Sequence, residues 1–407
     1  MSQAPAKAGL QTVTEARAAM LALVAPLGCE DVALSDALNR VLAADIAARR
    51  DQPPFAASAM DGYAVRAADT PGVLPVIGES AAGRGFEGVL DRAAAVRIST
   101  GAPVPEGADT IAIQEDVLRE GPTATIPATR PGRHIRPRGG DFTVGTVLLQ
   151  RRRRLDGVAL ALAAASGAAI LPVARRPRVG ILCSGDELAS PGDVPGPFQV
   201  YDSATHGVAA LIQSWGGKPV HLPGVLDDVG AIAAAAEQAL RDSDLLVVLG
   251  GASVGDHDHA RPALIKLGLR LAVEKIAVRP GKPTWFGITP RAPVLGLPGN
   301  PASALVCAHL FLRPILEAML GRDAKDCVGF RRARLAHALP ANGPREHYLR
   351  AQVRVDEGGS LVAQAHENQD SSLLSIFSAA NALIRLVPDA PAFKAGALVD
   401  VLLLDVP

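Results

Sequence analysis

The chain has 407 residues, and its 41 Lys and Arg are balanced by 41 Asp and Glu, so no overall field favours nucleic acid or an anionic membrane. A hydrophobic content of 48% allows real cores to form, and the length predicts about two to four domains. The four cysteines are widely spaced without a CxxC pair, which argues against a disulfide framework or a zinc ribbon. The first residues lack a signal-peptide layout, and no apolar run reaches about 20 residues. We therefore expect a cytoplasmic protein that binds neither nucleic acid nor membrane.

The first 176 residues change from a helical pattern to a β pattern and back. Apolar residues recur at three- and four-residue spacing in the helical part, where Thr14 and Ser35 are candidate N-caps. Short β-like runs separated by Gly and Pro predict a β-rich module over residues 51–145. We expect this module to be inserted into one discontinuous helical and linker domain, formed by residues 8–50 and 146–176. The helices predicted in this half are 14–27, 35–48 and 155–167.

Strands and helices alternate over residues 177–328, which predicts an α/β sandwich domain with a mostly parallel sheet. Residues 329–407 return to a β pattern with Gly, Asp and Pro turns, which predicts a small C-terminal barrel or sandwich. The fold class is therefore multidomain α/β plus β. The strands predicted in the α/β domain are RVGILC, PVHLPGV, DLLVVLG, EKIAV and PVLGL, and the predicted helices are 202–215, 228–241, 258–267 and 301–320.

Three glycine-containing loops each follow an apolar run of β-formers and lead toward a helix-like stretch. In a parallel sheet such loops meet at the carboxyl ends of the strands, where ligands bind. Glycine lets backbone N–H groups close on an anion, whereas carboxylates in the same loops need a hard cation to bridge them to phosphate. The loops therefore predict a phosphorylated ligand held with Mg²⁺. The candidate binding residues are Ser184, Gly185, Gly250, Gly251, Ser253, Pro298, Gly299, Asn300 and Pro301.

Carboxylates in or near these loops are candidate metal ligands. Glu187 and Asp258 suit Mg²⁺, directly or through water. The Asp-His-Asp-His run around Asp258 does not favour zinc, because residues two apart on a helix point in different directions. Asp227 and Asp228 follow a predicted strand end, and metal binding and helix N-capping are equally good interpretations of this pair.

Three cations, Lys275, Arg279 and Lys282, follow one another closely. In a strand the first two would share a face and could bind one anion, although a solvent-facing strand edge is the alternative. Asp61 lies in an Asp-Gly pair and Thr100 at a strand-to-loop junction, and on the residues alone a hairpin and a hydroxyl turn are better explanations of these two than catalysis or anion binding. The chain lacks the glycine patterns of Rossmann dinucleotide sites and of P-loops.

Six segments taken in order are far more specific than any one of them: SAMDGYAV, RISTGAPVPEGAD, CSGDEL, GGASVGDHD, VRPGKP and GLPGNP. Their order and spacing resemble the molybdopterin molybdenumtransferase family, which includes bacterial MoeA and the gephyrin E domain, over essentially the whole chain. The resemblance implies an elongated homodimer of four-domain subunits, with an α/β domain of the molybdopterin-binding type. It also implies molybdenum insertion from molybdate into adenylylated molybdopterin, with Mg²⁺-assisted pyrophosphate cleavage and AMP release.

The resemblance assigns roles to individual residues. Asp61 and Thr100 are expected to reach the active site from the partner subunit, which makes the site composite. Arg279 stands where the resemblance leads us to expect lysine. The positive charge is kept, but a planar guanidinium with paired N–H donors replaces a compact ammonium group. Arg350 and Ser371 are candidate molybdate ligands. The catalytic candidates are Asp61, Thr100, Glu187, Asp227, Asp258, Lys275 and Arg279; Lys282 is a further substrate-binding candidate; the metal candidates are Glu187, Asp227 and Asp258.

Two other functions stay open on the sequence alone. One is a scaffold or carrier that binds molybdenum cofactor without turnover, and the other is an adenylyltransferase or related nucleotide hydrolase. The acids retained in the loops argue against the first, and the N-terminal module is unexplained by the second. Besides a second copy of the chain, a molybdopterin adenylyltransferase and molybdoenzyme maturation factors are the expected partners.

Overall fold

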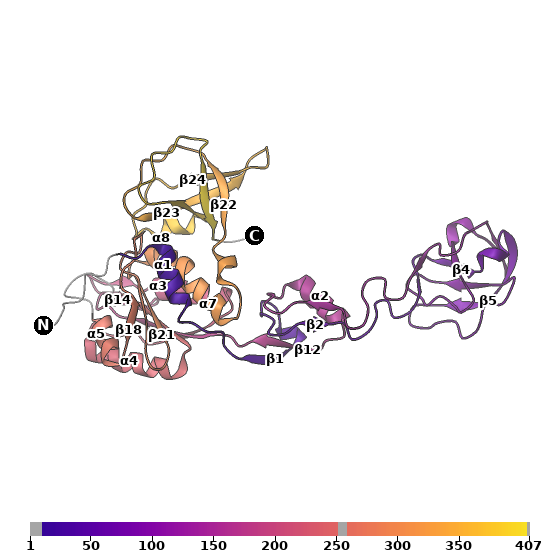
Figure 1. Cartoon of the computed structure of the whole chain (residues 1–407), viewed down its shortest axis with the longest axis horizontal. Helices are drawn as coiled ribbons and strands as arrows, with labels where there is room; N and C mark the ends of the chain where they lie inside the picture. The colour runs from indigo at the N-terminus through magenta and orange to yellow at the C-terminus, as the bar shows by residue number, and fades with distance from the viewer. Residues whose placement is uncertain (1–9, 251–258, 405–407) are drawn as a thin grey trace. The chain divides into compact units, whose positions relative to one another are not determined.

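The computed structural model describes residues 10–250 and 259–404, and the chain forms two compact units (Figure 1). One unit is Asp31–Val173, and the other combines Met1–Glu30 with Ala174–Pro407. The four domain ranges expected from the sequence stay predictions, whereas the predicted class, α/β plus β with a C-terminal barrel, is confirmed.

The larger unit contains a six-stranded sheet in the order β16-β13-β17-β21-β20-β18. Strands β16, β13, β17 and β21 are parallel, and β20 runs antiparallel to both of its neighbours. Helices cover both faces, so the central strand β17 is fully buried and reads as an unbroken apolar run. The strands are β13 (Arg178–Cys183), β16 (Lys218–His221), β17 (Leu245–Leu249), β18 (Arg270–Val273), β20 (Trp285–Ile288) and β21 (Pro293–Leu297).

Four helices of this unit begin at a side-chain cap, as in α1 and α4, or with proline in the first turn, as in α6 and α7. Thr12 and Glu15 form a reciprocal capping box at the first helix, so its N-cap is Thr12 and not the predicted Thr14, and the helix ends six residues earlier than expected. Asp228 caps the fourth helix. The helices are α1 (Val13–Leu21), α3 (Ala204–Ser214), α4 (Val229–Asp242), α5 (Ala260–Lys266), α6 (Pro301–Cys307) and α7 (Arg313–Met319), with a π-helical segment, Ala308–Leu312, between the last two.

Helix Pro301–Met319 is long and apolar enough to cross a membrane by length and composition. However, 89% of its apolar window is buried inside the protein, where it packs in the main core of the unit. The helix is therefore best explained as a core helix.

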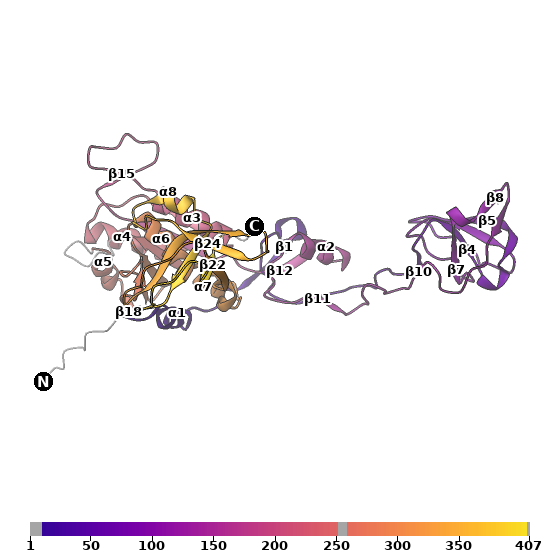
Figure 2. The same cartoon turned by 90° about the horizontal axis from the view of Figure 1, so that it is seen from above.

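The C-terminal part of the same unit is a closed five-stranded barrel. Two of its strands, β22 and β24, are labelled in Figure 2. Its strands follow the cyclic order β23-β24-β22-β26-β25, and β25 pairs again with β23. A short strand from the α/β part, β19 (Val278–Arg279), extends this sheet by pairing with β23. The barrel strands are β22 (Phe330–Leu335), β23 (Glu346–Val355), β24 (Leu361–Ala365), β25 (Ala382–Leu386) and β26 (Leu398–Leu403); helix α8 (Leu374–Ser378) lies between β24 and β25 in the chain.

The smaller unit contains a six-stranded sheet in the order β7-β4-β6-β5-β9-β8, with an apolar cluster on each face. Helix α2 (Gly157–Ala165) has Asp156 as its N-cap and packs in a third cluster. The strands are β4 (Gly62–Val65), β5 (Gly72–Ser80), β6 (Ala95–Ile98), β7 (Thr110–Ile113), β8 (Leu118–Glu120) and β9 (Thr123–Ile126). Two-stranded pairs join β1 (Cys29–Ala33) to β12 (Ile170–Ala174), β2 (Ile46–Ala47) to β11 (Val147–Leu149), and β3 (Ala57–Ser58) to β10 (Ile135–Arg136).

The predicted helix 35–48, with Ser35 as its cap, is wrong. Only a 3-10 turn, Leu34–Asp36, forms there, and Asn39 has a positive φ of 61° that interrupts any helix. The following backbone bonds to the returning chain instead, with Leu42 N–H donating to the Arg153 carbonyl and Ala48 N–H to the Thr146 carbonyl. Pairing with a distant segment therefore overrides the local apolar spacing.

Candidate functional site

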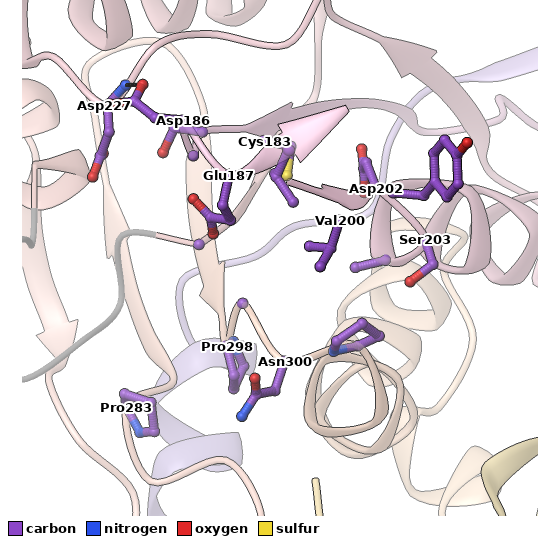
Figure 3. Close-up of a pocket in the computed structure, with 18 residues that line it drawn as sticks. Cys183, Asp186, Glu187, Val200, Asp202, Ser203, Asp227, Pro283, Pro298 and Asn300 are labelled. Atoms are coloured by element: carbon purple, nitrogen blue, oxygen red, sulfur yellow. Dashed lines mark hydrogen bonds between the residues drawn. The ribbon is translucent and has the colours of Figure 1, made fainter. Parts of the chain in front are cut away.

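The carboxyl ends of β13, β17 and β21 border a cavity of about 650 Å³ (Figure 3). Ser184 follows the first of these parallel strands, Gly250 the second and Pro298 the third. The three predicted loops therefore do meet, as the topology of a parallel sheet requires. The Pro298 loop leads directly into helix α6, whereas the Ser184 loop continues into the short strand β14 (Leu188–Ala189), which pairs with β15 (Val200–Tyr201). The loop after Gly250 continues outside the described residues. The predicted loop residues that line the cavity are Ser184, Gly185, Glu187, Gly250, Pro298, Gly299, Asn300 and Pro301.

Glycine is required where the loops after β13 and β17 touch. Gly250 has a φ of 85°, and a Cβ there would lie 2.7 Å from the carbonyl oxygen of Ser184. A Cβ on Gly299 would lie 3.4 Å from the Gly250 Cα. The backbones of all three loops are thus close together, which leaves room for a ligand only on the cavity side.

Among the described residues, the charged side chains that line this first cavity are all carboxylates: Asp186, Glu187, Asp202 and Asp227. Figure 3 shows the loop of Asp186 and Glu187 facing the loop of Pro298 and Asn300 across the cavity. Asp186 Oδ1 accepts a hydrogen bond from the backbone N–H of Asp227 over 3.2 Å, which ties two of the acidic loops together. We call this the acidic cavity.

Two buried oxygens of the acidic cavity have no hydrogen-bond partner among the described residues: Ser184 Oγ and Asp227 Oδ1. A buried polar atom without a partner is costly, so such atoms in a cavity indicate a bound group. The neighbouring Asp228 differs, because its Oδ1 accepts from the N–H groups of Gly230 and Ala231, which lower its pKa. Within this acidic pair Asp228 is the helix cap and Asp227 faces the cavity.

The acidic cavity fits a hard divalent cation by the chemistry of its donors. Asp227 Oδ1 and the Glu187 carboxylate are the oxygen ligands that Mg²⁺ prefers. Within the part of the chain that the structure describes, no group of three His, Cys, Asp or Glu residues is close enough to hold a metal alone. The third predicted ligand, Asp258, and the predicted binding residues Gly251 and Ser253 lie outside the described residues.

A second cavity, of about 400 Å³, adjoins the first and has the opposite charge. Its lining holds three cations, Arg279, Lys282 and Arg345, against one carboxylate, Asp370, and we call it the cationic cavity. Pro283, Pro298 and Asn300 line both cavities. The predicted residue Ser371 also lines the cationic cavity, where its hydroxyl accepts a hydrogen bond of 3.0 Å from Asn300 Nδ2. Positive and negative sites are therefore separated by one shared wall.

The predicted strand EKIAV is wrong in extent, because regular strand pairing in this segment is limited to Val278–Arg279. The preceding backbone bonds elsewhere: Ala277 N–H donates to the Gln11 carbonyl, and Ile276 N–H to the Lys282 carbonyl. Lys275 therefore does not share a strand face with Arg279, and it lines neither of these cavities. A functional role for Lys275 stays a prediction.

Arg350 is 2% exposed and does not line the cationic cavity. Its Nε donates to Gln369 Oε1, and its Nη1 donates to the carbonyls of Asp370 and Leu373. Burial lowers the pKa of this guanidinium. These contacts fix the loop that carries Ser371, so they indicate a positioning role, and the predicted role as a molybdate ligand stays a prediction.

In the smaller unit the structure brings Asp61 and Thr100 together. Asp61 immediately precedes β4 and Thr100 follows β6, and these strands pair with Gly62 opposite Ile98. The backbone N–H of Thr100 donates to Asp61 Oδ1 over 2.6 Å, and both residues are exposed. Two weak sequence signals 39 residues apart thus form one polar site.

Sequence reasoning missed Asp202, Arg345 and His347, which line the acidic or the cationic cavity. None belongs to a glycine loop. Arg345 and His347 lie where the chain enters β23, a strand in which Arg350 was the predicted site residue. In the sequence these two residues are only basic groups at the start of a predicted strand, and such groups are too common to predict a binding site.

Three family models match successive parts of the chain. The MoeA N-terminal region (domain I and II) matches residues 11–167, a probable molybdopterin binding domain matches 180–318, and the MoeA C-terminal region (domain IV) matches 332–404. Proteins named molybdopterin molybdenumtransferase are similar throughout: that of Nostoc sp. is 34% identical, covering 93% of this chain and 89% of its own. The Haemophilus influenzae protein is 35% identical, covering 96% and 98%. A crystal structure of a molybdopterin biosynthesis MoeA protein from Pyrococcus horikoshii has a TM-score of 0.84 at 31% identity, covering 98% of this chain and 100% of that chain.

Proposed function

The chain belongs to the MoeA family of molybdopterin molybdenumtransferases, and we propose on this premise that it inserts molybdenum from molybdate into adenylylated molybdopterin, with Mg²⁺-dependent pyrophosphate cleavage and release of AMP. The observation that carries the proposal is the pair of adjoining cavities with opposite charge. The reaction joins two anionic substrates, of which one must be cleaved at a pyrophosphate and the other delivered as a dianion.

The acidic cavity suits the pyrophosphate only with a cation, because four carboxylates would repel phosphate. Glu187 and Asp227 would hold Mg²⁺, with Asp258 as a third ligand. When bound, Mg²⁺ neutralises charge that develops on the leaving phosphate. The backbone of the loops at Gly185 and Gly299 lets the substrate approach closely, since neither residue carries a side chain.

The cationic cavity suits molybdate, a small tetrahedral dianion. The Arg279 guanidinium can donate two parallel hydrogen bonds to one oxyanion, and Lys282 adds a compact charge. Ser371 lies within hydrogen-bond distance of Asn300, so its hydroxyl is held in place at the wall between the cavities. These residues would hold molybdate beside the molybdopterin site.

We further propose that the protein acts as a cytoplasmic homodimer in which Asp61 and Thr100 of one subunit complete the site of the other. A heterodimer experiment tests this. Asp61→Asn and Glu187→Gln each abolish AMP release as homodimers, because every site carries a defect. Co-expressed with two different tags and purified through both, the mixed dimer has one doubly altered site and one intact site, so about half of wild-type activity returns. Failure to restore activity would mean that both residues act from one subunit.

The scaffold or carrier function makes a different prediction. Purified protein that binds cofactor tightly yet releases no AMP with Mg²⁺ and molybdate would favour it over the enzyme. A molybdopterin adenylyltransferase is the proposed supplier of the adenylylated substrate, since its product carries the pyrophosphate that this reaction cleaves.

A further inference from the structure

A third cavity, of about 610 Å³, lies at the end of the C-terminal barrel, and the proposed reaction does not use it. We call it the barrel cavity. It is bounded by the loop after β22, the beginning of β23 and the residues after β24. Leu339, Leu349 and Leu386 form an apolar part of its lining, and His337, His347 and His366 form a polar part.

The barrel cavity shares a wall with the cationic cavity. Arg279, His347 and Gln369 line both of them. Gln369 is fixed in this wall, since its Oε1 accepts from the Arg350 N–H and its Nε2 donates to the carbonyls of Arg350 and His366. Because Gln369 is already hydrogen-bonded, Arg279 and His347 are the two side chains of the shared wall that can bind a ligand in either cavity.

Two histidines of the barrel cavity have unused hydrogen-bonding capacity. His347 is 8% exposed, and no hydrogen bond of its ring is found within the described part of the chain. His366 Nε2 is buried and also has no partner there, although the backbone of His366 is held by Gln369 and Arg350. Burial is the main cause that lowers the pKa of His347 to about 4, and the positive charges of Arg279, Arg345 and Arg350 lower it further. The ring is therefore neutral at pH 7. A neutral imidazole carries one N–H donor, which suits an oxyanion acceptor.

We propose that the barrel cavity is a second binding site for a tetrahedral oxyanion of the molybdate class, with Arg279 and His347 shared between it and the cationic cavity. The inference rests on the proposed function, because it names a second position for the same substrate. Arg279 supplies charge, His366 supplies a buried Nε2 that has no partner among the described residues, and His347 supplies a neutral ring in the shared wall. The Glu367 carboxylate also lines the cavity but is exposed, so water screens its repulsion of an anion.

Equilibrium dialysis of the full-length protein against molybdate, with bound molybdenum counted per subunit, tests the proposal. Wild type should bind two molybdates per subunit. His366→Leu should bind one, and it should still fold, because no hydrogen bond of its buried Nε2 is lost and an apolar group of similar size replaces it. Lys282→Ala should retain one molybdate in the barrel cavity. His221→Leu, which changes an exposed histidine of the α/β part, is the matched control and should bind two.

Tungstate-soaked crystals of the wild-type protein give an independent readout through anomalous scattering, with one peak expected beside Lys282 and one beside His366. A single peak at Lys282, together with one bound molybdate in both wild type and His366→Leu, would overturn the second site and leave the proposed function standing. Binding that is absent from wild type would overturn both. Sulfate and phosphate added as competitors show whether the barrel cavity distinguishes molybdate from other tetrahedral dianions; displacement of the second molybdate by either supports a general oxyanion site of this class.

Discussion

Acid should destabilise the larger unit through His309, which lies in the π-helical segment and is 4% exposed. Its ring packs edge-on against Trp215 at 5.0 Å, and Nδ1 has no hydrogen-bond partner among the described residues. Burial is the main cause that lowers the pKa of His309 from 6.5 to about 3, and the positive charge of Arg313 lowers it further. Between these values the unfolded chain binds a proton that the folded chain does not bind. The stabilisation by neutral His309 is therefore complete above pH 6.5 and is lost as the pH falls toward 3.

The magnitude follows from linkage. At pH 5.0 an unfolded histidine is about 1.5 pH units below its pKa while folded His309 stays neutral, and each unit is worth about 1.4 kcal/mol. The folded state should thus lose about 2 kcal/mol through this residue between pH 7.5 and 5.0. His309→Phe keeps an aromatic ring against Trp215 and removes the titration, so its free energy of unfolding should fall by about 2 kcal/mol less than that of wild type.

Urea denaturation followed by tryptophan fluorescence measures this difference. The chain has two tryptophans, and both Trp215 and Trp285 are buried in the larger unit, so the signal reports that unit. His221→Phe, at an exposed histidine, is the control and should behave like wild type. Equal losses of stability in wild type and His309→Phe would refute the reasoning, since the buried ring would then not titrate between folded and unfolded states.

Three further predictions concern the acidic cavity. Asp228→Ala should lower the melting temperature by about 2–4 °C through loss of the α4 cap, as measured by calorimetry. Asp227→Ala should leave the melting temperature unchanged, because its buried Oδ1 has no partner among the described residues, yet it should abolish AMP release; retained AMP release would remove Asp227 from the site. Gly250→Ala should cost about 1–2 kcal/mol in urea denaturation, because alanine at a positive φ is strained and its Cβ would meet the Ser184 carbonyl. A stability equal to wild type would show that the loops after β13 and β17 can separate.

The meeting of the three loops could be predicted from sequence because two local rules agree. The runs before Ser184, Gly250 and Pro298 are continuous β-formers, and parallel strands bring their carboxyl ends to one edge. The resemblance added Asp61 and Thr100, whose hydrogen bond no spacing rule could have given.

Other features depend on contacts that sequence patterns do not record. Residues 35–48 have helical spacing, but the N–H groups of Asn39, Leu42 and Ala48 bond to carbonyls of the segment 146–155. Lys275 and Arg279 have strand spacing, but the backbone of this segment bonds to Gln11. The Lys275 carbonyl accepts from the Gln11 N–H, and the Ala277 N–H donates to the Gln11 carbonyl. The sequence places Arg350 in a strand without showing that its guanidinium turns inward to hold the loop of Ser371. In each case a distant partner decides the outcome, and one sequence read alone contains no sign of that partner.

We propose a division of labour between an acidic cavity that cleaves pyrophosphate and a cationic cavity that binds molybdate. Steady-state AMP release as a function of molybdate concentration, compared between wild type and Lys282→Ala, tests this most directly. Loss of one charged hydrogen bond of about 1.5–3 kcal/mol should raise the KM for molybdate about 10- to 160-fold, while kcat at saturating molybdate is retained. A Lys282→Ala enzyme with an unchanged KM for molybdate and a lowered kcat would contradict the account.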